Sequence, residues 1–268
     1  MNIDEIINGV NLKQIADAIV DTDRMDDINH LPSNSVIWCK TEFIDMVFDT
    51  LRTSNNVYKL ITHCSDHSIT EDVFRRKPPC ILKWYAQNVD FLHDDLIPLP
   101  IGLENHIGPH KGNSIDIKYV DIMHPARVVK KNVDMIYCNF NLHTYNNRPN
   151  VSQIIKNKNI GFFDSPKPFS EYCESMKNFL FVASPRGNGI DCHRTWEALY
   201  LGSIPIVEKH FMYDSYKTLP IIQIENWNNI SIKNLLEKCE NFKYNPLQFT
   251  REELKLNFWK NEIKFGTL

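Results

Sequence analysis

Short runs of apolar residues, each about as long as one buried strand, recur along most of the chain and are bounded by turn residues. These runs cover residues 36–39, 57–62, 81–85, 135–140, 179–183, 204–207 and 221–224. Between several of them lie stretches with the spacing of an amphipathic helix, at 41–51, 151–158, 168–176, 192–201 and 232–242. Strands that alternate with helices are typical of parallel sheets with helices on both faces, so we predict an α/β fold.

The apolar rhythm is interrupted between residues 105 and 132 by glycine, proline and lysine, which is typical of a linker. We therefore predict two domains, 1–125 and 126–249, and a final helical segment at 250–268 that packs back onto the first domain. The predicted architecture is a pair of doubly wound, Rossmann-like domains that face a central cleft. Ligands of open α/β sheets collect at the carboxyl ends of the strands, so such a cleft would be the binding site.

Composition and charge narrow the function. The 268 residues carry a formal net charge of -3, so the molecule as a whole does not attract a polyanion, and we expect no nucleic-acid partner. There is no apolar run long enough to cross a bilayer and no basic leader before an apolar stretch, so we expect no membrane span. The seven cysteines are scattered without a CxxC pair, which favours a reducing, cytoplasmic location and no zinc site.

The most informative segment is 179–207, which is predicted to form a strand, a tight loop, a helix and a second strand. Gly187 and Gly189 flank Asn188, which predicts left-handed turns that bring backbone N–H groups close to a ligand. Asp191 is the predicted N-cap of the helix, and Gly202 is predicted to end it.

A helix that begins just after such a turn presents free N–H groups and the positive end of its dipole, which suits a phosphate. His193, Arg194 and Glu197 fall within one arc of the predicted helix. Arg194 could contact a diphosphate, and Glu197 could accept hydrogen bonds from ribose hydroxyls. The alternative is a plain glycine turn followed by a surface ion pair between Arg194 and Glu197.

This segment resembles the exostosin-like glycosyltransferases and their short viral and bacterial relatives, whose sugar-nucleotide half carries the pattern SPRGNGxDxHRxWEALxxGxIPI. The residues that match it without a gap are Ser184, Pro185, Arg186, Gly187, Asn188, Gly189, Asp191, His193, Arg194, Trp196, Glu197, Ala198, Leu199, Gly202, Ile204, Pro205 and Ile206. The resemblance is strong but local, because it is confined to 184–206 of the 268 residues.

The resemblance implies a GT-B fold, in which the C-terminal half holds the donor nucleotide and the N-terminal half holds the acceptor. It also implies catalysis with no metal and no other cofactor, in which protein cations and helix dipoles stabilise the departing diphosphate. The implied donor-binding residues are Ser184, Arg186, Gly187, Asn188, Gly189, His193, Arg194 and Glu197. Arg148, which follows the first predicted strand of this half, is a second candidate cation; a solvated loop arginine is the alternative.

The N-terminal half offers a candidate catalytic base. Asp66 lies in a polar loop directly after the strand at 57–62, and viral relatives of the family place an aspartate in a similar THxSD segment. An inverting transfer needs a base for the acceptor hydroxyl, and a carboxylate can serve. An Asx-turn or helix N-cap is an equally common role for such an aspartate. If Asp66 is remote from the anomeric carbon, a retaining transfer is the alternative.

His63, His67 and Trp84 are the candidate acceptor-binding residues, because they follow or end N-terminal strands. A zinc site at His63, Cys64 and His67 is disfavoured, since a fourth ligand and the usual spacing are missing. The alternative for Trp84 is a core residue, which is the more common role of such a side chain.

These observations predict an inverting glycosyltransferase that moves a sugar from a UDP- or GDP-sugar, with UDP favoured, to a carbohydrate hydroxyl. The alternatives are a catalytically inactive nucleotide-sugar or glycan-binding module and a DNA-base glucosyltransferase, the latter disfavoured by the acidic balance. A homodimer is left open. The expected location is the cytoplasm, and the host cytoplasm if the protein is viral.

Overall fold

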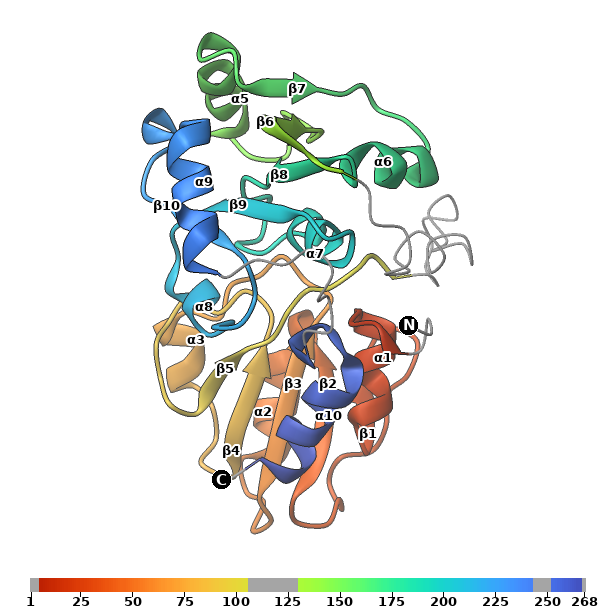
Figure 1. Cartoon of the computed structure of the whole chain (residues 1–268). Coiled ribbons are helices and arrows are strands. Elements are labelled where there is room, and N and C mark those ends of the chain that lie inside the picture. The colour runs from red at the N-terminus through yellow and green to blue at the C-terminus, as the bar shows by residue number, and fades with distance from the viewer. Residues whose placement is uncertain (1–4, 106–129, 243–251, 267–268) are drawn as a thin grey trace. The chain divides into compact units, whose positions relative to one another are not determined.

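The computed structural model describes residues 5–105, 130–242 and 252–266, which form two compact units (Figure 1). The N-terminal unit contains residues 5–102, the tripeptide Gly189–Asp191 and residues 255–266. The C-terminal unit contains the other described residues. Each unit is built on a parallel sheet of five strands, which confirms the predicted α/β class and is consistent with a two-domain Rossmann-like arrangement. The predicted domain boundary at residue 125 and most of the predicted linker lie outside the described residues.

The sheet of the N-terminal unit has the order β1-β2-β3-β4-β5. Its strands are β1 (Ala18–Val20), β2 (Ser35–Lys40), β3 (Tyr58–His63), β4 (Ile81–Ala86) and β5 (Leu96–Pro98). Its helices are α1 (Gly9–Leu12), α2 (Ile44–Leu51), α3 (Glu71–Arg75) and α10 (Leu256–Phe265), with short 3₁₀ turns at Lys13–Ile15 and Thr41–Phe43. The predicted strands at 36–39, 57–62 and 81–85 and the predicted helix at 41–51 are confirmed.

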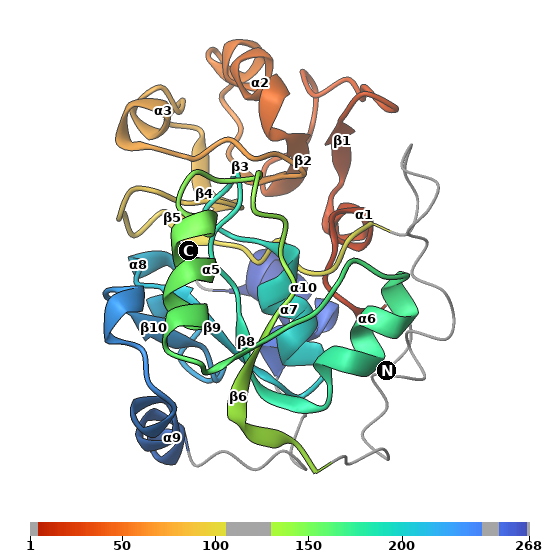
Figure 2. The same cartoon turned by 90° about the horizontal axis from the view of Figure 1, so that it is seen from above.

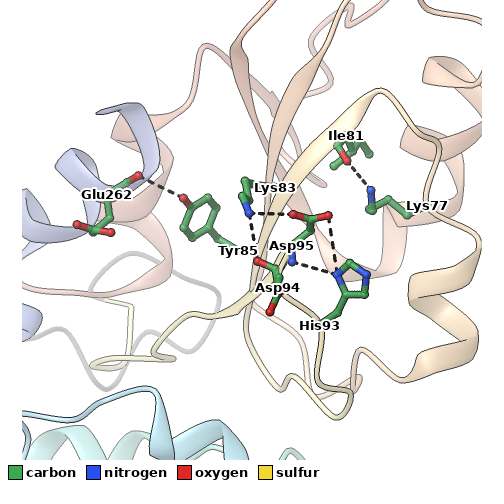
Figure 3. Close-up of polar contacts among 8 residues, drawn as sticks. All are labelled: Lys77, Ile81, Lys83, Tyr85, His93, Asp94, Asp95 and Glu262. Atoms are coloured by element: carbon green, nitrogen blue, oxygen red, sulfur yellow. Dashed lines mark hydrogen bonds and ion pairs between the residues drawn. The ribbon is translucent and has the colours of Figure 1, made fainter. Parts of the chain in front are cut away.

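Two neighbouring residues of β4 show what covers each face of this sheet. Trp84 packs edge-on against Phe48 of α2, with ring centroids 5.5 Å apart, and stacks on Phe74 of α3. Successive side chains of a strand point to opposite faces. Accordingly, the hydroxyl of Tyr85 donates to the carbonyl of Glu262 in α10 (3.2 Å), as Figure 3 shows. Helices α2 and α3 therefore lie on one face, and α10 covers the other.

The strand order of the N-terminal sheet corrects part of the predicted architecture. Among the described strands, each one pairs with its neighbour in sequence, so the order contains no reversal. Right-handed crossovers that always step in one direction place their helices on the same face, as α2 and α3 show. The second face is covered by α10, which comes from the end of the chain. This unit is therefore not doubly wound in the predicted sense.

The sheet of the C-terminal unit has the order β10-β9-β8-β6-β7. Its strands are β6 (Asn132–Cys138), β7 (Gly161–Phe163), β8 (Phe179–Ala183), β9 (Ile204–Glu208) and β10 (Ile222–Ile224). Its helices are α5 (Arg148–Asn157), α6 (Phe169–Met176), α7 (His193–Tyr200), α8 (Phe211–Asp214) and α9 (Ile232–Asn241). Short 3₁₀ turns lie at Trp227–Asn229 and Glu252–Leu254. Every strand and helix predicted between residues 135 and 242 is confirmed, and β7 and α8 are additions.

This sheet is covered on both faces by its own crossover helices. On β6, Ile136 belongs to the core cluster that includes Ile155 of α5 and Leu235 of α9. The next residue, Tyr137, points to the other face, where its ring centroid lies 6.1 Å from that of Tyr172 in α6. Figure 2 shows α5 and α6 on opposite sides of β6. This unit is doubly wound, as predicted.

The strand order of the C-terminal sheet reverses between β6 and β8. The chain leaves β6 for β7 at the edge of the sheet and then returns to β8 on the other side of β6. The connections after β6 and β8 therefore run to opposite faces, which opens a crevice outside the carboxyl ends of these two strands. The segments that follow them are Asn139–Asn141 and Ser184–Gly187.

Helix α7 follows β8. Its end was predicted correctly, but its start was not. At its end, Gly202 has a left-handed φ of 72°, and the amide of Ser203 donates to the carbonyl of Ala198 (2.8 Å). This is a Schellman motif, so the predicted stop at Gly202 is confirmed. At its start the predicted N-cap, Asp191, is wrong, because the N-cap is Cys192. The carboxylate of Asp191 instead accepts the amide of Ile101 (2.9 Å).

No helix within residues 5–105, 130–242 or 252–266 combines the length and the apolar character that a bilayer span requires.

Candidate functional site

A pocket of about 240 Å³ lies in the C-terminal unit, where the segment after β6 meets α6 and α7. Its lining residues are Glu104, Asn139, Phe140, Asn141, Phe169, Tyr172, Arg194 and Glu197. The segment 139–141 is the one that leaves the sheet at the reversal of strand order, so topology and cavity indicate the same place. Two of the predicted donor-binding residues, Arg194 and Glu197, line this pocket.

Arg194 places a cation in the first turn of α7. Its Nε donates to the carbonyl of Asn139 (3.0 Å), and its guanidinium lies 5.6 Å from the ring centroid of Phe140. The hydrogen bond and the aromatic ring orient the guanidinium plane. Because the first backbone N–H groups of a helix have no intrahelical partner, the positive end of α7 adds to the charge of this side chain.

Glu197 lies one turn further along α7 and is 7% exposed. Its Oε2 accepts a hydrogen bond from the hydroxyl of Tyr172 (2.7 Å). Burial raises the pKa of the Glu197 carboxyl above its ordinary value, although the Tyr172 hydrogen bond and the charges of His193 and Arg194 act in the opposite direction. The pair therefore presents a hydrogen-bond acceptor, held by a phenol, in the wall of the pocket.

His193 is the first residue of α7, and its Nε2 lies 3.4 Å from the Oε2 of Glu104. The pocket is thus lined by two carboxylates, Glu104 and Glu197, and one guanidinium, that of Arg194. Such a site can accept hydrogen bonds from hydroxyl groups and donate them to an anion.

Arg148 lies behind the pocket and is not among its lining residues. Its side chain is buried, and the guanidinium donates to three main-chain carbonyls: Arg186 (2.9 Å), Asn141 (3.0 Å) and Pro185 (3.2 Å). Burial and the positive charge of Arg194 lower the pKa of Arg148. Arg148 therefore holds together the segments that follow β6 and β8, and its charge adds to the positive potential near Arg194.

The loop after β8 is tied to the sheet and to α7 through Ser184. The amide of Ser184 donates to the carbonyl of Ile206 (2.9 Å), and its hydroxyl shares a hydrogen bond with that of Thr195 (2.9 Å). Arg186 lies 4.8 Å from the ring centroid of Tyr145 and donates from Nη2 to the carbonyl of Asn188 (3.3 Å). Its Nε is buried and has no hydrogen-bond partner among the described residues.

The predicted left-handed turns at Gly187 and Gly189 are wrong, because the glycines with positive φ in the described part of the chain are Gly102 and Gly202. Close packing explains Gly189 instead. A Cβ at Gly189 would lie 2.6 Å from the Nδ2 of Asn88, which is too close for any side chain. At Gly187 the nearest atom, the Nη2 of Arg148, would lie at 3.4 Å, which is an ordinary contact.

Asp66, the candidate base, is exposed in the loop that follows β3 in the N-terminal unit. The loop begins with a left-handed residue, Cys64, whose φ is 60°. A non-glycine residue in this region carries strain that surrounding contacts must hold. Here the amide of Cys64 donates to the side-chain oxygen of Gln87 (3.0 Å), which supplies one such contact.

Two of the three predicted acceptor-binding residues are core residues. His63 is 1% exposed, and its Nε2 donates to the carbonyl of Pro100 (3.0 Å). Trp84 is fully buried, and its indole N–H donates to the hydroxyl of Thr62 (2.8 Å). Neither side chain has surface to offer an acceptor sugar, so both predictions are wrong. His67 is exposed in the Asp66 loop, and its amide donates to the hydroxyl of Ser65 (3.1 Å).

Sequence reasoning missed most of the pocket wall. Phe169, Tyr172 and Glu104 carry no motif, and Tyr172 reaches Glu197 across 25 positions of the sequence. Asn139, Phe140 and Asn141 were visible only as the end of a strand. Their position directly after the first strand of a doubly wound unit is the signal that could have identified them.

Comparison with known proteins adds no assignment. Neither a scan against protein-family models nor a search of curated proteins finds a match for this chain. Within the described residues, no three His, Cys, Asp or Glu side chains gather in a way that could hold a metal ion.

Proposed function

We propose that this chain is a glycosyltransferase of the GT-B type that binds a nucleoside diphosphate sugar, with UDP favoured as the nucleotide. The observation that carries the proposal is the pocket at the strand-order reversal of the C-terminal unit, where α7 supplies both Arg194 and Glu197. The SPRGNG-type segment supplies that same helix and the loop before it, so the motif and the cavity support one another.

The phosphate end of the ligand would lie at the start of α7. Arg148 is buried and Arg194 is half-buried, and among the described residues neither guanidinium is hydrogen-bonded to a carboxylate. Buried cations whose partners are carbonyl groups favour an incoming anion, since charge-assisted hydrogen bonds are about twice as strong as neutral ones. The positive end of the α7 dipole acts in the same direction.

The nucleoside end would use the other walls of the pocket. Glu197 accepts hydrogen bonds from ribose hydroxyls while Tyr172 holds its second oxygen. The rings of Phe140 and Phe169, which also line the pocket, offer faces for a base or a sugar. His193 and Glu104 flank this region as a polar pair.

In the proposed reaction, Asp66 takes the proton of the acceptor hydroxyl while its oxygen forms a bond to the anomeric carbon. The bond from that carbon to the diphosphate breaks, and the electron pair leaves with the diphosphate. Arg194 and the α7 N-terminus stabilise the charge that develops there. The exposed position of Asp66 in a loop at the carboxyl end of β3 supports this role, because an acceptor can reach it.

A thermal-shift screen with UDP, GDP, CMP and their sugars tests the binding half of the proposal, since a ligand that binds only the folded state raises the melting temperature. We expect a response to one nucleotide and a loss of at least about tenfold in affinity in Arg194→Ala, from lost charge-assisted hydrogen bonds. Arg75→Ala is the matched control, because Arg75 is an exposed arginine of α3 that pairs only with Glu71 among the described carboxylates. An absence of response to every nucleotide would refute the proposal.

A transfer assay tests the chemical half. Donor turnover by the wild-type protein but not by Asp66→Asn would support an enzyme with Asp66 as its base. Nucleotide binding without turnover on any acceptor would instead assign a nucleotide-sugar-binding module.

A further inference from the structure

Asn88 follows β4 in the N-terminal unit, and its side chain is completely buried. The residue is left-handed, with a φ of 54°, a conformation that asparagine tolerates better than most residues. Its main-chain carbonyl accepts the amide of Ile69 (2.9 Å). A buried amide side chain is costly unless both of its ends are hydrogen-bonded, so the partners of Asn88 are informative.

The two ends of the Asn88 amide contact two different segments. Its Nδ2 donates to the carbonyl of Ser65 (3.0 Å), the residue directly before Asp66. Its Oδ1 accepts the amide of Asp191 (2.9 Å), two residues before α7 begins. Only one orientation of the amide satisfies a carbonyl on one side and an N–H on the other, so the network defines it.

Neighbouring groups hold the same amide in place. The Nε2 of Gln87 also donates to the carbonyl of Ser65 (2.8 Å). On the opposite side, Gly189 has no side chain, and this makes room for Asn88. A Cβ at Gly189 would lie 2.6 Å from the Nδ2 and 2.9 Å from the Oδ1 of Asn88. Asn88 and Gly189 therefore depend on one another for packing.

We propose that Asn88 is a positioning residue that joins the loop carrying Asp66 to the tripeptide Gly189–Asp191, from which the chain enters α7. The two hydrogen bonds of this buried amide hold the loop that carries the candidate base to the tripeptide. This inference rests on the proposed function for the roles of Asp66 and α7, but the hydrogen bonds that carry it do not.

Two substitutions separate the two ends of the amide. Asn88→Asp keeps an acceptor for the Asp191 amide but loses the donor to Ser65, and a second acceptor then faces the Ser65 carbonyl. Asn88→Ala removes both hydrogen bonds. Gly189→Ala displaces the Asn88 side chain. Asn229→Ala, at an exposed asparagine of the C-terminal unit, is the control.

Steady-state kinetics and nucleotide affinity are the decisive readouts. In Asn88→Asp we expect kcat to fall about tenfold, as expected for the loss of one buried hydrogen bond, while nucleotide affinity stays within about twofold of wild type. In Asn88→Ala and Gly189→Ala, both kcat and nucleotide affinity should fall. Asn229→Ala should keep both. A purely structural role would lower the melting temperature without this split between the two variants of Asn88.

Amide hydrogen exchange provides a readout that needs no activity. The Asp191 amide should exchange slowly in the wild type and in Asn88→Asp, and at least about tenfold faster in Asn88→Ala. If Asn88→Ala does not fold, Gly189→Ala serves the same comparison.

The outcomes distinguish this inference from the proposed function. Wild-type kcat in a folded Asn88→Asp, or unchanged exchange of the Asp191 amide in Asn88→Ala, would overturn the positioning role. Full transfer by Asp66→Asn would refute the assignment of the base instead, and the exchange experiment would still decide whether Asn88 holds the two segments.

Discussion

The two sheets have the same number of strands and the same parallel pairing but different strand orders, and the described pocket lies in the unit whose strand order reverses. In the C-terminal unit the order reverses between β6 and β8, and the described pocket lies beside the segment that follows β6. In the N-terminal unit the strands follow one another without reversal. There the connections between strands do not diverge to opposite faces. The loop after β3 is instead held by the side-chain amides of Gln87 and Asn88, which donate to the carbonyl of Ser65.

Cations that are buried or half-buried also differ between the units in the partners that they contact. In the N-terminal unit, Lys59 donates to the carbonyls of Ile263 (2.8 Å) and Lys264 (3.3 Å), so it closes the C-terminal end of α10. In the C-terminal unit, Arg194 lines a cavity. The ion pair of Lys83 with Asp95, shown in Figure 3, belongs to a partly exposed network on β4 and satisfies its own charges. A buried cation that no carboxylate or helix end neutralises is the stronger indication of a ligand.

The largest expected effect concerns Trp84, which the sequence placed in an acceptor site and the structure places in the N-terminal core. Trp84→Ala should lower the free energy of unfolding by about 3–5 kcal/mol, since it leaves a large cavity beside Phe48 and Phe74. Urea denaturation measures this change. Leu92→Ala is the control, because Leu92 is 70% exposed, and it should stay within about 0.5 kcal/mol of wild type. An unchanged free energy of unfolding in Trp84→Ala would contradict the assignment of Trp84 to the core.

The apolar pattern predicted most of the fold because strands and helices of a parallel sheet differ clearly in length and spacing. Two short strands were not predicted: β1 and β7, each of three residues. A three-residue strand at or near a sheet edge gives too little pattern to separate it from a loop. The strand order of the N-terminal unit was also out of reach, because sequence shows which segments are strands but not which ones pair.

The candidate site was predicted only where its residues are adjacent in sequence. The loop and helix at 184–197 could be recognised together, whereas the reason for Gly189 could not, because it depends on Asn88 from another part of the chain. Histidine and tryptophan at strand ends suggested sugar contacts, yet strand parity and burial turn His63 and Trp84 inward. Residue type and spacing do not reveal which face of a sheet is covered when the covering helix, α10, comes from the far end of the chain.

Lys131 tests the comparison of the cations in the two units, because it is the counterpart of Lys59 in the C-terminal unit. Its Nζ donates to the carbonyls of Lys177 (2.6 Å) and Leu201 (3.2 Å), the C-caps of α6 and α7. Lys131→Met should lower the free energy of unfolding at pH 9 by about 1–3 kcal/mol, because buried carbonyls lose a donor. Chemical denaturation measures it. Lys130→Met, at an exposed neighbouring position, is the control.

The pH dependence of stability gives Lys131 a second signature. Burial, with a smaller contribution from Lys177, lowers the pKa of Lys131 to about 7 from an ordinary value of 10.5. Between these values the unfolded chain binds more protons than the folded one, so the free energy of unfolding should rise with pH across that window. Lys131→Met should remove this rise, and the difference from wild type should shrink toward pH 6. An unchanged slope would show that Lys131 does not titrate in this range.

The smallest expected effect concerns the phenol that holds Glu197. Tyr172→Phe keeps the ring in the pocket wall but removes the 2.7 Å hydrogen bond to the carboxylate. That hydrogen bond opposes the effect of burial on Glu197, so its loss should raise the pKa of Glu197 further and leave the acceptor more often protonated. Nucleotide affinity should fall about threefold to tenfold near neutral pH, and the loss should become smaller as the pH falls and the carboxyl of the wild type is protonated as well.

Isothermal titration with the nucleotide found in the thermal-shift screen measures this change, and Tyr145→Phe is the control because Tyr145 contacts Arg186 through its ring face. Tyr172→Phe could lower the affinity for a 2′,3′-dideoxy nucleotide as much as the affinity for the ribonucleotide. That result would argue against Glu197 as a ribose acceptor, because the effect of the phenol would not depend on the ribose hydroxyls. A loss confined to the ribonucleotide would show that the pocket of the C-terminal unit recognises its ligand through the carboxylate that Tyr172 holds, and not only through the charge of Arg194.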